Sequence, residues 1–119
     1  MDSDGVVYEI KTDLKAVFYA RRAKREPNFY MEYRSTVSGS ECGIMTAEAD
    51  VLVYMLVNED HTITAYTFDY EQLKKHLSSS EYESRGNKTS GDDNAIGWVM
   101  PVSVLISHPE SGYRGSSIL

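Results

Sequence analysis

Glu9 and Lys11 are the residues of this sequence whose types and spacing best suit a chemical reaction. They lie within residues 5–11, where β-branched or aromatic residues alternate with polar ones, which predicts a strand. Positions i and i+2 of a strand share a face, so the carboxylate and the ammonium are expected to project together. A carboxylate that binds Mg²⁺, beside a lysine that orients and helps deprotonate a water, suits phosphodiester hydrolysis.

The same pair also has a simpler interpretation, a solvated ion pair on an amphipathic strand. Such a pair stabilises a fold by less than about 1 kcal/mol. Asp13 and Lys15 repeat the spacing four residues later, which shows how often it arises by chance. A hydrolytic metal site also needs a second carboxylate, and the spacing of Glu9 and Lys11 does not supply one.

The elements that must position these residues are those of a single domain over residues 1–119, of the α+β class or a small α/β fold. We expect one mixed central sheet flanked by a few short helices. The patterns predict strands at residues 5–11, 28–34, 51–57, 62–68 and 96–106, with Pro101 at an edge or bulge. They predict short helices at residues 46–50 and 70–76, a flexible loop at about 78–94 and a frayed tail at about 109–119. Residues 12–24 fit either a short helix or an ordered basic loop.

Charge is distributed unevenly along the chain, whose formal net charge is −6. Residues 11–34 hold seven basic and three acidic residues, whereas the rest of the chain holds five basic and fifteen acidic residues. Net negative charge opposes general DNA binding, but a local basic segment can still hold phosphates. The candidate phosphate-binding residues are Arg21, Arg22, Lys24, Arg25 and Arg34. A solvated basic helix or loop is the alternative interpretation of the same residues.

Several short motifs occur in one order along the first half of the chain. Tyr8–Asp13 contains Glu-x-Lys followed by Thr-Asp, and Asn28–Tyr33 ends in Glu-Tyr. Cys42–Ile44 contains Gly-Ile, and Thr46–Asp50 precedes an apolar strand. In this order the chain resembles small phage-type proteins similar to the PD-(D/E)xK nucleases, whose fold is that of restriction endonucleases and Holliday-junction resolvases. The resemblance covers about residues 5–57 and, more loosely, residues 97–101.

The resemblance implies a restriction-endonuclease-like core and a role for each matched residue. Glu9 would be a metal ligand and Lys11 the catalytic lysine, with Mg²⁺ as the cofactor. Glu32 would be an acid near the metal, and Gly43 and Asp50 would order the turn or face the substrate. In the family, an acidic ligand on a preceding strand completes the set. Here that strand is missing, as in an N-terminally truncated member, and Asp4 or Asp2 would have to take its place by folding back across Glu9.

Composition excludes several other classes of protein and site. The longest strongly apolar run, residues 51–57, is far shorter than the roughly 20 residues of a membrane-spanning helix. Residues 1–4 do not begin a secretory signal, and a single cysteine, Cys42, favours a reducing compartment. We therefore expect an intracellular protein, in the host cytoplasm if phage-encoded, without a membrane partner. The three histidines lie far apart in the sequence, which does not favour a zinc site.

Two functions remain open from the sequence. The first is a Mg²⁺-dependent nuclease-like protein that hydrolyses or binds DNA, expected to be a homodimer because one such domain is small for gripping a duplex. The second is a catalytically inactive, nuclease-fold binding protein, such as a phage-encoded inhibitor of a host defence protein. The missing first acid and the negative net charge favour the second function.

Overall fold

The structure, a computed structural model, describes residues 5–14, 16–22, 24, 26–36, 38–89 and 93–119, with the backbone alone for 19, 87–89 and 93–94. In this part of the chain the strands are β1 (Tyr8–Asp13), β2 (Asn28–Ser35), β3 (Val51–Val57), β4 (Ile63–Asp69), β5 (Glu83–Thr89), β6 (Asp93–Pro101) and β7 (Tyr113–Ile118). The α-helices are α1 (Ala16–Arg22), α2 (Tyr70–Ser79) and α3 (Val102–Ser107). Two short 3-10 turns are η1 (Gly43–Met45) and η2 (Pro109–Ser111). The fold is therefore of the α+β class, with sheets predominating.

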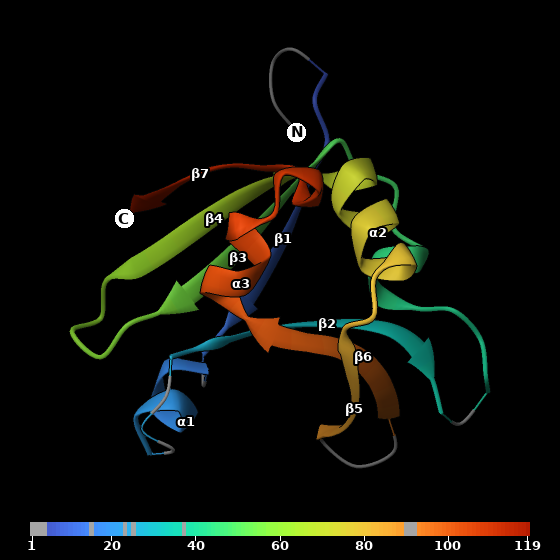
Figure 1. Ribbon diagram of the computed structural model, residues 1–119, viewed down its shortest axis with the longest axis horizontal. Helices are drawn as coiled ribbons and strands as arrows, with labels where there is room; N and C mark the ends of the chain where they lie inside the picture. Colours follow the sequence, from blue (N-terminus) through green and yellow to red (C-terminus); the bar gives the residue numbers. More distant parts are fainter. Residues whose placement is uncertain (1–4, 15, 23, 25, 37, 90–92) are drawn as a thin grey trace.

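The strands form two sheets (Figure 1). Sheet A has the order β1-β3-β4-β7, with β1 parallel to β3 and the other neighbours antiparallel. Sheet B has the order β2-β6-β5 and is antiparallel throughout. The strand that carries Glu9 and Lys11, β1, is thus an edge strand of sheet A.

Local sequence explains where the helices begin. Asp69 ends β4 and caps α2, because its side-chain carboxylate accepts a hydrogen bond from the Gln72 N–H at 2.9 Å. The Asp13 carboxylate accepts one from the Ala16 N–H at 2.9 Å at the start of α1. Pro101 ends β6 and precedes α3, where its missing N–H is not needed for a ladder hydrogen bond. None of the described helices is long and apolar enough to span a membrane.

The hydrophobic core lies between the two sheets. Phe29 of β2 places its ring 4.4 Å from that of Tyr54 on β3 and 5.9 Å from that of Phe68 on β4, and all three side chains are fully buried. Leu73 and Leu77 of α2 and Leu105 of α3 belong to the same cluster. Aromatic contacts thus hold the two sheets together, and the helices close the core around them.

The structure corrects the expected sheet and several expected elements. The strands divide into two sheets instead of one central sheet. Residues 46–50 form no helix, and the 3-10 turn η1 precedes them. The segment predicted as a loop contains β5, the apolar run 96–106 is divided between β6 and α3, and the tail contains β7. Pairing with a neighbouring strand outweighs a weak local preference in β5 and β7, whose Ser- and Gly-rich sequences resemble loops.

Candidate functional site

Glu9 and Lys11 share a face of β1, as their spacing predicts. They are paired in register with Leu52 and Tyr54, so both point to the core side of sheet A. Glu9 is exposed and Lys11 is half-buried. The Glu9 carboxylate faces the start of α2: burial raises the pKa of Tyr70 to about 12, and the negative charge of Glu9 adds to that shift.

The other predicted metal ligands do not join Glu9 in the described residues. Glu32 lies on β2 in sheet B, and Asp4 lies outside the described part of the chain. Asp13 shares the face of Glu9, but its two carboxylate oxygens accept hydrogen bonds from the Tyr54 hydroxyl and the Ala16 N–H, each at 2.9 Å. Within the described ranges, no three His, Cys, Asp or Glu residues are grouped so that they could hold a metal ion.

Asp50 and Gly43 each lie in direct contact with the backbone of another segment of the chain. The Asp50 carboxylate accepts a hydrogen bond from the Val7 N–H at 2.9 Å, and the Asp50 N–H donates to the Val7 carbonyl at 2.8 Å. Asp50 thereby fixes the start of β1 beside β3. Gly43 begins η1 directly against the backbone of Glu32.

The basic residues predicted to hold phosphates are divided between two regions. Arg21 and Arg22 are exposed in the last turn of α1, where Arg21 forms an ion pair with Glu59 at 3.2 Å and Arg22 lies over the Phe18 ring. Lys24 follows α1 and is exposed. Arg34 lies near the far end of β2, six residues along the strand from its start or about 20 Å away. Arg25 lies outside the described residues.

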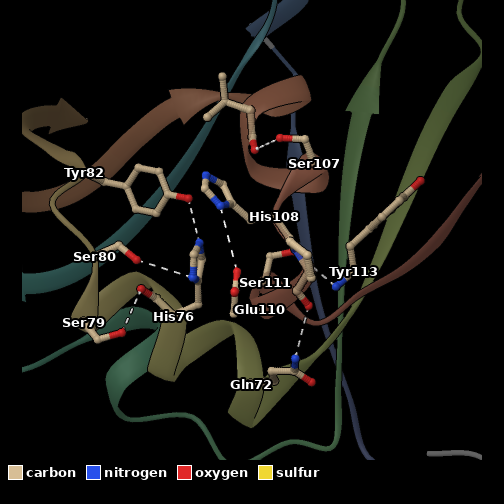
Figure 2. A network of polar contacts seen from close by, with 12 residues as sticks. Gln72, His76, Ser79, Ser80, Tyr82, Ser107, His108, Glu110, Ser111 and Tyr113 are labelled. Carbon is tan, nitrogen blue, oxygen red and sulfur yellow. Dashed lines mark hydrogen bonds and ion pairs between the residues drawn. The ribbon is translucent and has the colours of Figure 1, made fainter.

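A polar cleft that the sequence did not predict lies beside α2 (Figure 2). Its volume is about 640 Å³. One wall is a face of α2, and the other is the connection from α3 into η2. The lining residues include Gln72, Lys75, His76 and Ser79 on the first wall and His108 and Glu110 on the second.

Both ring nitrogens of His76 form hydrogen bonds with hydroxyl groups beside the cleft. Its Nε2 lies 2.7 Å from the Tyr82 hydroxyl, and its Nδ1 lies 3.3 Å from the Ser80 hydroxyl. The His108 ring centroid is 5.2 Å away, and the Glu110 carboxylate lies 4.0 Å from His108 Nδ1. In either neutral tautomer the His76 ring has one donor and one acceptor, which the two hydroxyls can match.

The surroundings of His76 favour its neutral form. The side chain is 8% exposed, and burial lowers its pKa. His108 lowers the pKa further, while Glu110 acts in the opposite direction. No sequence motif could reveal this cluster, since His76 and His108 lie on separate elements.

Acidification is expected to destabilise the fold through His76. Because the folded pKa lies below the unfolded value of 6.5, the unfolded chain takes up the proton first. The contribution of His76 is complete above pH 6.5 and is lost as the pH falls toward the folded pKa. One group changes the free energy of unfolding by at most about 1.4 kcal/mol per pH unit. Urea unfolding between pH 8 and pH 5 measures this loss.

The matched comparison is between two histidine variants. In His76→Gln the loss of stability between pH 8 and pH 5 should be smaller than in the wild type. His61→Asn, at an exposed turn with a φ of 70°, should keep the wild-type pH dependence. Equal pH dependence in His76→Gln and the wild type would contradict a titrating His76.

A second surface feature is the side of sheet A that faces away from the core. In β3 the residues Leu52, Tyr54 and Leu56 face the core, so the alternate residues face outward. We call the outward residues of the four strands the outer face. It consists of Tyr8, Ile10, Thr12, Val51, Val53, Met55, Val57, Ile63, Ala65, Thr67, Asp69, Gly115 and Ser117.

The outer face is mostly apolar and separate from the core, and its one charged residue, Asp69, lies at the end of β4. None of its thirteen residues belongs to the core cluster, whereas α1, α2, α3 and sheet B all contribute side chains to that cluster. Ile10, at the β1 edge, is 57% exposed. The ion pair between Asp69 and Arg114, at 3.0 Å, lies at the rim.

Comparisons of the chain with known protein families, with curated proteins and with solved structures found no match.

Proposed function

We propose that this chain is a non-catalytic protein-binding module whose working surface is the outer face of sheet A. The observation that supports the proposal is β3, which is apolar on both sides although the core lies on one side only. Strands with apolar residues on both sides are typical of sheets that are covered on both sides. This is the second function left open by the sequence, a binding protein with a protein partner.

The gain from covering the outer face is the transfer of its aliphatic side chains out of water. Val53, Met55 and Val57 are already half-buried within the isolated sheet, so each gains less than the about 1.5–3 kcal/mol that full burial of an exposed side chain contributes. Asp69 is the one charged residue among the thirteen, and its charge is already paired with that of Arg114. Both properties favour association through this face.

Photo-crosslinking tests the proposal. A benzophenone amino acid at position 10, on the exposed edge of the outer face, is expected to form a discrete covalent adduct with a protein on irradiation in cells that express the chain. Met55→Glu in the same chain places a charge in the middle of the face and should abolish the adduct.

The matched control places the same charge elsewhere. Ser78→Glu, on the exposed side of α2, should leave the adduct intact. An adduct that persists in Met55→Glu, or no adduct from position 10, would rule out the outer face as the binding surface.

A Mg²⁺-dependent nuclease of the PD-(D/E)xK type, with a restriction-endonuclease-like core, is the second candidate function. It is supported by Glu9 and Lys11, which share an accessible face of β1, and by the exposed Arg21 and Arg22 on the helix that follows. DNA would be the substrate or ligand. A cleavage assay with Mg²⁺ on linear and branched DNA decides this candidate: activity that is unchanged in Glu9→Gln and Lys11→Ala would eliminate it.

A further inference from the structure

We infer that the outer face is covered by a second copy of this chain, so that two sheets A stack face to face in a symmetric dimer. This inference rests on the proposed function, because it names the partner of the same face. It is carried by the distribution of charge over the chain, the relief of the outer face and the size of sheet A.

The charge distribution favours a second copy. Each copy carries a formal net charge of −6, so two copies repel each other at most orientations. The outer face has one charged residue, Asp69 at the end of β4, and its ion pair with Arg114 is neutral as a unit. It is therefore a surface over which two acidic chains can meet with little repulsion. A different partner is normally selected by a complementary charge pattern, which this face lacks.

The relief of the outer face is compatible with contact between identical surfaces. Met55 and Ala65 are paired across β3 and β4, so a long flexible side chain stands beside a small, 5%-exposed one. In a two-fold symmetric interface the same patch meets itself. An axis near this pair brings Met55 of each copy onto Ala65 of the other, at the spacing of about 10 Å typical of stacked sheets.

The size of the sheet sets the strength of the dimer. Four strands spaced about 4.8 Å apart, with seven residues rising about 3.3 Å each, give a footprint of roughly 450 Å² per copy. A standard protein interface buries about 800 Å² per partner. The dimer is therefore expected to be weak, with a dissociation constant in the micromolar range.

Sedimentation equilibrium over about 5 to 500 μM protein tests the dimer. The wild type is expected to change from mostly monomer to mostly dimer over this range, and higher NaCl should strengthen the dimer by screening the repulsion between like-charged copies. Met55→Glu should weaken it by about 30-fold or more, because an unpaired charge would be buried twice. Ser78→Glu adds the same charge outside the face and should stay within about threefold of the wild type.

A variant that fails to fold must be distinguished from one that fails to dimerise. Circular dichroism checks the fold of Met55→Glu, and Ile10→Lys, at an already exposed position, provides a second disruptive variant. A wild type that stays monomeric at 500 μM, or a folded Met55→Glu that dimerises equally well, would overturn the inference. If the wild type is monomeric but position 10 still crosslinks to another protein, the dimer is wrong and the proposed function stands. If neither is observed, both fail.

Discussion

Gly43→Ala is expected to lower the free energy of unfolding by about 3 kcal/mol, measured by urea denaturation. Gly43 has a φ of +56°, and a Cβ at this position would lie 2.2 Å from the carbonyl oxygen of Glu32. The opposing atom is backbone, so no side chain can rotate out of the way. Left-handed strain costs about 1 kcal/mol and forced overpacking a further 1–3 kcal/mol.

Gly39→Ala separates these two contributions. Gly39 also has a positive φ, +71°, but a Cβ there would meet nothing within 4 Å. Its loss should therefore be limited to about 1 kcal/mol of backbone strain. Equal losses at the two positions would show that η1 does not pack closely on β2.

Phe29→Ala is expected to lower the free energy of unfolding by about 3–5 kcal/mol, a large part of the roughly 5–15 kcal/mol of a typical domain. Phe29 is fully buried on sheet B, and its ring contacts those of Tyr54 and Phe68 on sheet A. Its removal leaves a cavity where the two sheets meet. Circular dichroism and urea denaturation measure the loss of folded structure.

Two further variants serve as controls, one for the volume of the side chain at position 29 and one for the burial of the ring that is removed. Phe29→Leu fills most of the space and should cost clearly less than Phe29→Ala. Phe18→Ala removes the same ring from a side chain that is 55% exposed on α1 and should cost less than about 1 kcal/mol. A small loss in Phe29→Ala would contradict a core that joins the two sheets through this residue.

The shared face of Glu9 and Lys11 could be predicted from the sequence, whereas the cleft beside α2 could not. The shared face of Glu9 and Lys11 follows from their spacing of two residues in a strand, so it was predictable. His76 comes from α2 and His108 from the residue after α3, and no local pattern links them. Folding brings their rings within 5.2 Å, and burial of His76 then lowers its pKa.

The sequence by itself determined the strands with strong β-forming composition, and with them much of sheet A. Alternation or a continuous apolar run identified the ends of β3 and β4 within one residue and those of β1 within three, because a two-residue period is a local property. The acidic residues and Leu spacing around 70–76 similarly predicted α2. Where the β-forming composition is weak, as in β5 and β7, the sequence wrongly predicted a loop and a frayed tail instead of strands.

The tertiary structure alone decided which strands are neighbours and which faces are covered. The pairing of β1 with β3 and of β2 with β6 joins residues more than 35 positions apart. Such pairing depends on packing against the core and not on the residues adjacent in sequence. For this reason the run at residues 51–57 could be predicted as a strand, but only the fold shows that one of its apolar sides faces away from the core.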